Sequence, residues 1–368
     1  MSQTTIVWGK DAQAQKKWSA RLYAETLGKS YWEKFIGKGD DAVIQRKTEL
    51  EADAGDRVSF DLSVQLRGKP VAGDNRLEGT EEQLKFFTDE VIIDQLRKAV
   101  SCGGKMTRKR TAHDLRSVAK SRLSEWWSQY IDQMIFIYMS GARGMNENFE
   151  AFDLTYTGHA GNPIRTPDGQ HLLYAGAATS KATLTAADKM SRQVIEKVSH
   201  KAQMMRALDP RSANLLPVPV GQGKHYVMVM NPTQVYDLRT EVGSGGWLDI
   251  QKAAAAAEGS KNAVFTGNLG MIDDIVLHKH SDVIRFNDYG AGSNVAAARA
   301  LFLGRQAAVV AYGTTGGLNF EWKEEMTDYG NEPSVAAGCI LGVSKTRFNK
   351  RDFGIVAVDT ASKDPNAA

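Results

Sequence analysis

Apolar and polar residues alternate from Val58 to Leu66, which is typical of a half-buried strand. Turn-forming residues follow at 67–70 and 73–75. Residues 83–93 then return as either a strand or a short helix. The pattern predicts a polar, strand-rich excursion over residues 53–100.

Between Leu115 and Tyr138, apolar residues recur at steps of three and four, which places them along one side of a helix. Thr111 to Asp114 resembles a capping box, and Gly141 is a typical helix stop. We therefore predict one long helix over about residues 111–140, roughly 40 Å long at about 1.5 Å per residue.

A second amphipathic helix is predicted from Met190 to Met205, with a start resembling a capping box at residues 185–188. A strand at residues 225–230 runs into Asn231-Pro232, which is typical of the start of a short helix.

Beyond this helix, a flexible loop at 243–246 precedes a helix at 247–258. Further strands are predicted at residues 263–265, 275–278, 283–286, 336–343 and 353–358. Helices and strands are intermixed without regular βαβ alternation, which predicts an α+β fold.

The composition fits one large or two ordinary globular domains, with 368 residues, 42% hydrophobic and 24% charged. A net charge of +3 is too small for the whole chain to be a nucleic-acid binder. Cys102 and Cys339 lie far apart, which favours a reducing compartment over a disulfide framework or zinc site. The most apolar window, Ile131–Met139, is about half of the roughly 20 residues needed to cross a bilayer, so we expect no membrane association.

Residues 1–52 look irregular and carry widely spaced aromatics, among them Trp8, Trp18 and Trp32. They are either a frayed terminus with a few anchors or an arm whose aromatics dock on another subunit, because Trp supplies a large contact area at low entropic cost.

Two charged segments are candidate contacts. Residues 78–94 contain six acids and one base, and we single out Glu78, Glu81 and Glu82, together with the nearby Arg76. Residues 101–125 contain seven bases and two acids, including Lys105, Arg108, Lys109 and Arg110. Both segments can simply be solvated. A basic helix start opposes the helix dipole, however, so an acidic partner is expected: residues 78–94 of a neighbouring subunit, or nucleic-acid phosphate.

Catalytic motifs are weak. Asp273, Asp274, His278 and His280 form the best metal-like cluster and define the alternative hypothesis, a metal-dependent hydrolase. A third hypothesis is a nucleic-acid-binding module at residues 105–122. Residues 24–30 end like a phosphate-binding loop, but Tyr23 stands where its first glycine belongs. We therefore expect no catalytic, cofactor or metal site.

Several short motifs follow one another in a characteristic order around the long helix. They are Gly55-Asp56-Arg57-Val58-Ser59-Phe60, Leu77-Glu78-Gly79-Thr80, Phe265-Thr266-Gly267-Asn268, Leu303-Gly304-Arg305-Gln306, Asp328-Tyr329-Gly330-Asn331 and residues 345–355. In this order, nearly the full chain resembles a major capsid (coat) protein of a tailed bacteriophage, similar to the podophage branch of the Hong Kong 97-type capsid fold.

The resemblance implies a subunit in several parts. These are an N-terminal arm (1–52), an extended β-hairpin loop (53–100), a peripheral domain with the spine helix at about 111–140 (101–185 and 333–360), an axial domain (186–332) and a C-terminal tail (361–368).

The resemblance also implies a function. Such a protein is not an enzyme and needs no cofactor; it self-assembles into hexamers and pentamers of an icosahedral shell that encloses packaged double-stranded DNA. The expected partners are copies of itself, a separate scaffolding protein, the portal, DNA on the inner face and, where a shell carries one, a decoration protein. The expected location is the virion, after assembly in the host cytoplasm. A nearly neutral net charge suits a shell, because strongly like-charged subunits repel one another.

Overall fold

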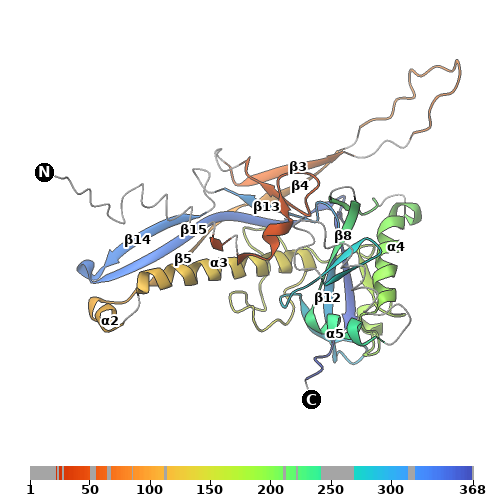
Figure 1. Cartoon of the computed structure of the whole chain (residues 1–368). Helices are drawn as coiled ribbons and strands as arrows, with labels where there is room; N and C mark the ends of the chain where they lie inside the picture. Colours follow the sequence, from red (N-terminus) through yellow and green to blue (C-terminus); the bar gives the residue numbers. More distant parts are fainter. Residues whose placement is uncertain are drawn as a thin grey trace.

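The computed structural model of the chain describes residues 22, 25–26, 29–49, 55–63, 68–84, 86–111, 114–209, 213–220, 223–241, 269–313 and 320–366. The molecule is elongated, with a long helix beneath long strands at one end and a part built of helices and shorter strands at the other (Figure 1). Helices and strands are intermixed along the chain, so the predicted α+β class is confirmed.

Six strands form the sheet of the elongated end. β15 (Glu332–Lys345) is the longest, and its first half lies between β14 and β5, both antiparallel to it. Its second half pairs with β13, and the sheet continues through β2 to β1. The remaining bounds are Trp32–Phe35 (η1), Ile36–Gly37 (β1), Ile44–Lys47 (β2), Asp94–Ser101 (β5), Ala308–Tyr312 (β13), Glu321–Thr327 (β14) and Asp328–Gly330 (η5).

Eight strands form the second sheet, in the order β6-β18-β12-β8-β10-β9, with β11 beside β12 and β7 beside β8. Alternate residues of β8 point to opposite faces. Met228 and Met230 join a core with α4 and α5, whereas Val227 and Val229 join the core of the long helix. The bounds are Leu172–Tyr174 (β6), Val218–Val220 (β7), Gly223–Met230 (β8), Gly270–Ile272 (β9), Ile275–Lys279 (β10), Arg285–Tyr289 (β11), Val295–Leu303 (β12), Ile355–Ala361 (β18), Lys181–Thr183 (η3), Arg192–Leu208 (α4) and Pro232–Thr240 (α5).

The long helix α3 (Leu115–Ser140) begins later than predicted. The short helix α2 (Lys105–Arg110) precedes it, and Thr111 closes α2 by donating its hydroxyl and its N–H to the Thr107 carbonyl. Thr111 is therefore not the cap of α3; the Asp114 carboxylate accepts from the Arg116 N–H instead. The predicted end is confirmed, because Gly141 adopts the left-handed conformation at φ 69°.

Burial changes along α3. In its first half, Ala119, Leu123 and Trp127 are buried and Val118 is exposed, so one side faces the core as predicted. From Ile131 to Ser140 every residue is buried, because both sheets and the loops after the helix surround this half.

Helix α4 also begins later than predicted, at Arg192 after the cap Ser191. Its expected start at residues 185–188 is a turn, since the Asp188 carboxylate accepts from both the N–H and the hydroxyl of Thr185. Lys189 then bridges to Ala361 at the edge of β18. By contrast, α5 begins as predicted, with a capping box between Asn231 and Gln234.

The predicted strands 225–230, 275–278 and 336–343 lie within β8, β10 and β15. Those predicted at 283–286 and 353–358 overlap β11 and β18 but are shifted toward the N-terminus. The pattern missed β12 and β13 because they are alanine-rich and largely buried on both faces, which removes the alternation.

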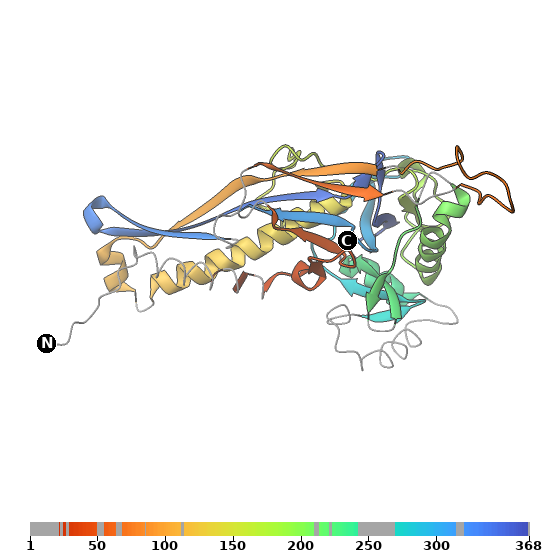
Figure 2. The ribbon, with the colours of Figure 1, turned by 90° about the horizontal axis from the view of Figure 1, so that it is seen from above.

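Residues 86–92 return as a strand and not as a helix. β4 (Phe86–Ile92) pairs antiparallel with β3 (Arg57–Ser63), and residues 68–84 project beyond the paired strands (Figures 1 and 2). β5 leaves this hairpin and joins the six-stranded sheet, which Figure 2 shows from above.

The end of α3 is tied to the eight-stranded sheet through a buried arginine. Arg299 of β12 makes two hydrogen bonds to the Asp359 carboxylate, at 2.7 and 2.8 Å, and one to the Ser140 carbonyl at 2.9 Å. Because Asp359 lies on β18, directly opposite Arg299 in the sheet, the carboxylate holds the guanidinium in place and its remaining nitrogen reaches the end of α3. The helix predicted at 247–258, the loop at 243–246 and the strand at 263–265 lie outside the described residues.

Candidate intersubunit interface

The projecting loop, residues 68–84, is almost entirely exposed. Leu77 and Leu84 each expose 65% of their surface, and Phe86 at the start of β4 exposes 60%. Exposed large apolar side chains that gather on one projection are typical of surfaces that another protein covers. In the sequence these apolar residues are surrounded by polar ones, so no periodic pattern marks them and only the charged residues were singled out.

The predicted charged contacts of this loop lie close together. Arg76 and Glu78 form an exposed ion pair. Glu81 accepts a hydrogen bond from the Gly79 N–H at 2.7 Å, and Glu82 accepts one from the Gly68 N–H at 2.6 Å. The Glu81 and Glu82 carboxylates thus hold the shape of the loop.

The predicted basic cluster lies on α2, at the opposite end of the molecule (Figure 1). Lys105, Lys109 and Arg110 are exposed and make no ion pair with any residue that the structure describes. Arg108 is half-buried and donates to the Asn331 carbonyl at 3.0 Å.

Farther along, the charge of residues 101–125 is balanced within the chain: Arg116 pairs with Glu324, Lys120 with Glu25 and Arg122 with Glu125. The unbalanced positive charge is therefore confined to α2.

Trp32 does not lie at a surface, contrary to the prediction. Its side chain is fully buried against Phe136 of α3, so it cannot reach a neighbour from this position. Asp132 of α3 holds this segment by accepting from the Ser30 hydroxyl at 2.7 Å and the Tyr31 N–H at 2.8 Å. Burial raises the pKa of Asp132 to about 6. Trp8 and Trp18 lie outside the described residues.

The residues of the hydrolase alternative serve as structure and do not converge. Asp273 and Asp274 form the turn between β9 and β10, both with positive φ. His278 is buried beside Phe35, and His280 stacks on Phe136. Within the described part of the chain, no three His, Cys, Asp or Glu residues are arranged to hold a metal ion.

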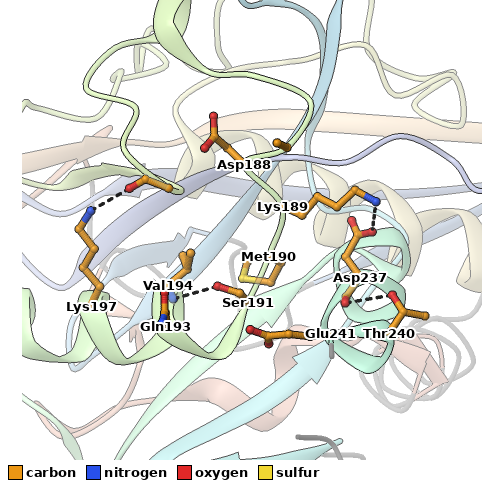
Figure 3. Close-up of a pocket in the computed structure, with 12 residues that line it drawn as sticks. Asp188, Lys189, Met190, Ser191, Gln193, Val194, Lys197, Asp237, Thr240 and Glu241 are labelled. Atoms are coloured by element: carbon orange, nitrogen blue, oxygen red, sulfur yellow. Dashed lines mark hydrogen bonds and ion pairs between the residues drawn. The ribbon is translucent and has the colours of Figure 1, made fainter. Parts of the chain in front are cut away.

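A cavity of about 390 Å³ lies between the start of α4 and the end of α5 (Figure 3). Its charged groups pair with one another or with the backbone: Lys189 with Asp237 at 3.1 Å, Glu241 with the Arg192 N–H at 2.8 Å, and Lys197 with the Gly176 carbonyl at 3.3 Å. The buried Oδ2 of Asp237 has no hydrogen-bond partner among the described residues, and burial raises the pKa of this carboxyl. Among the residues that line this cavity, no nucleophile is hydrogen-bonded to a base. Hydrolysis by an activated side chain requires that arrangement.

No helix in the described ranges is both long enough and apolar enough to span a bilayer.

Solved phage capsids share this architecture. The capsid of Ralstonia phage GP4 is similar with a TM-score of 0.88 and 59% identity, over 99% of this chain and 100% of that one. The capsid of cyanophage Pam1 has a TM-score of 0.71 at 20% identity, over 99% and 100%. The fold is thus the Hong Kong 97-type capsid fold, and the class is that of phage shell proteins.

The chain belongs to the phage capsid protein family, whose sequence profile matches residues 7–364. The major capsid protein of Pseudomonas phage KPP25 is 26% identical over 375 residues, covering 94% of both chains. The protein therefore functions as a major capsid protein, a structural component of the virion that associates with copies of itself.

Proposed function

We propose that the chain forms the hexamers and pentamers of an icosahedral shell around packaged double-stranded DNA, assembles in the host cytoplasm and has no catalytic activity. One observation supports this most directly: the loop 68–84 extends from the body and leaves Leu77 and Leu84 in water. A single copy gains nothing from such a projection, whereas a lattice of copies buries it.

The proposed division of the subunit follows the arm, extended loop, peripheral domain, axial domain and tail of the sequence analysis, with refined boundaries. β5, β13 and β14 pair with β15, which supports including 94–101, 308–312 and 321–332 in the peripheral domain. β18 pairs with β12, which supports including 355–361 in the axial domain. The extended loop then spans residues 53–93.

The contact between neighbours is proposed to join the loop of one copy to α2 of another. The loop carries Glu78, Glu81 and Glu82, and α2 carries Lys105, Lys109 and Arg110 without an acidic partner among the described residues. These surfaces lie at opposite ends of the molecule, so they cannot meet within one chain. Two different surfaces that complement each other make a head-to-tail contact, which closes into rings when the rotation permits.

The remaining partners are proposed on the same basis: a scaffolding protein during assembly, the portal at one vertex, DNA at the inner face and, where the shell carries one, a decoration protein outside. The arm, residues 1–52, is proposed to contact a neighbouring subunit through Trp8 and Trp18, and Trp32 is left out because its own subunit buries it.

The test is to replace residues 69–81 with a short Gly-Ser turn, which retains the Gly68–Glu82 closure and the paired strands β3 and β4. We expect a folded subunit with an unchanged melting temperature that fails to build closed shells in electron micrographs. A matched control replaces the exposed pair Arg192 and Glu196 of α4 with Gln and should assemble normally. Normal shells from the loop variant would contradict the proposed role of the loop.

A further inference from the structure

A network of buried charges holds the base of the projecting hairpin. Asp89 of β4 exposes 8% of its surface, and its carboxylate accepts from Arg165 twice, at 2.7 Å from Nη1 and at 2.9 Å from Nη2. The Arg347 N–H donates to the same carboxylate at 3.0 Å. The Glu90 N–H donates as well, at 3.0 Å, so Asp89 accepts four hydrogen bonds, two from a guanidinium and two from the backbone.

The network continues into the body of the subunit. Arg347 Nε donates to Asp352 at 3.0 Å, and Lys345 Nζ donates to the other oxygen of that carboxylate at 2.7 Å. The side chains of Lys345 and Asp352 are each 1% exposed. Arg347 also donates to the Thr166 carbonyl at 2.7 Å. Strand β4, the loop around residue 165 and the end of β15 are thus joined through shared partners.

Apolar packing holds the same base from another side. Val58, Phe60 and Val91 form a small core with Val309, Ala311 and Phe348, and the rings of Phe60 and Phe348 meet edge-on at 6.0 Å. Apolar burial stabilises the contact but has little directionality. A two-pronged arginine–carboxylate pair has a preferred plane and direction, so it restricts the angle at which the hairpin leaves the body.

A purely stabilising role explains this network poorly. Buried ion pairs contribute little net stability compared with apolar residues of the same volume, because each charge loses its hydration. Their better-supported use is to select one geometry. Here the geometry selected is the direction of a loop that must reach a second copy.

We infer that Asp89, Arg165 and Arg347 are positioning residues for shell assembly: they hold the hairpin in its binding direction before a neighbour arrives. This inference rests on the proposed function, in which residues 68–84 contact another subunit. A loop that is already aligned loses less conformational freedom on binding, so its contact is tighter for the same buried area.

The test compares Arg165→Lys with Arg57→Lys. The first substitution keeps the positive charge but removes the fork that binds both oxygens of Asp89, whereas Arg57 forms an exposed pair with Glu90 on the same hairpin. Spin labels attached at Asp61→Cys on the hairpin and Ala207→Cys on α4 report the direction of the hairpin in unassembled subunits. Both positions are exposed, whereas the native Cys102 and Cys339 are buried and therefore escape labelling.

For Arg165→Lys, we expect a broader label-to-label distance distribution and a yield of closed shells lower by about tenfold, which corresponds to ~1.4 kcal/mol. The melting temperature should change by only a few degrees, and Arg57→Lys should match the natural chain in all three measurements. A merely structural role would lower the melting temperature without broadening the distances of the folded subunits.

An unbroadened distribution with a normal shell yield would overturn the inference. If Arg165→Lys does not fold, Asp89→Asn, which keeps an oxygen acceptor for the Arg347 N–H, is judged by the same criteria. The loop replacement described above separates the two proposals. If that variant fails to assemble while Arg165→Lys assembles normally, only the positioning role is wrong; if both assemble normally, the loop contact itself is wrong.

Discussion

Asp132 shows how a single buried carboxyl group anchors the segment before the first strand. It lies on α3 and accepts hydrogen bonds from Ser30 and Tyr31, yet burial still dominates and raises its pKa from 3.8 to about 6. Between these two pH values the folded chain keeps a proton that the unfolded chain has lost. The contribution of Asp132 to stability is therefore fully present below pH 3.8 and lost as the pH rises through about 6.

Asp132→Asn removes this titration. The stability of the variant relative to the natural chain should rise between about pH 4 and about pH 6, by ~1.4 kcal/mol for each unit of pKa shift. Urea unfolding of unassembled subunits at both pH values measures this difference. The negative charge of the neighbouring Asp282 also raises the pKa of Asp132, so Asp282→Asn serves as a control that measures this contribution separately. A pH-independent difference between Asp132→Asn and the natural chain would show that Asp132 does not titrate in this window.

At the scale of the element, α3 presents two adjacent tryptophans in different environments. Trp127 is fully buried and meets Phe320 at 5.4 Å between ring centroids. Trp126 is partly buried, stacks on Tyr130 and lies beneath the Lys98 ammonium group. The sequence pattern assigned both to one stripe, but only the fold distinguishes them.

We expect Trp127→Ala to lower the free energy of unfolding by ~3–5 kcal/mol, the usual cost of truncating a large aromatic side chain in a core. Trp126→Ala should cost clearly less, because part of its surface already contacts water. Denaturant unfolding of the two variants forms a matched pair. Equal losses would mean that the packing around the two rings is alike.

At the scale of the whole molecule, the proposed contact joins the acidic loop 68–84 of one copy to the basic helix α2 of the next. It predicts that reversing the charge on both surfaces together preserves their attraction, whereas reversing one surface alone does not. Reversing Lys105, Lys109 and Arg110 to Glu should reduce shell formation through repulsion from the acidic loop of the neighbour. Reversing Glu78 to Lys in the same chain should then restore part of the assembly, because this change leaves the Glu81 and Glu82 carboxylates that hold the shape of the loop.

Electron microscopy and sedimentation of the single and combined variants measure this rescue. Normal assembly of the α2 variant, together with a loss of salt-dependent binding to short duplex DNA, would instead favour α2 as a phosphate-binding surface. Both surfaces are exposed in one copy, so neither variant is expected to unfold the subunit.

Local features of the molecule follow from the sequence alone. The Asn231-Pro232 start of α5, the glycine that ends α3 and the alternating strand β3 were all predicted, because caps, left-handed glycines and period-two patterns depend on residues a few positions apart. The basic cluster at residues 105–110 was also recognised in the sequence, but its separate helix α2 was not predicted. The order of short motifs also determined the family resemblance.

Only the tertiary structure decided which distant residues meet. β12 and β13 gave no alternating pattern because the fold buries both of their faces. Trp32 was predicted to contact another subunit, but α3 of its own chain covers it. Nothing in the sequence indicated that Asp89 and Arg165, which are 76 positions apart, form an ion pair. Burial and ion pairing depend on which elements pack together in space, and a pattern read along the chain does not contain that information.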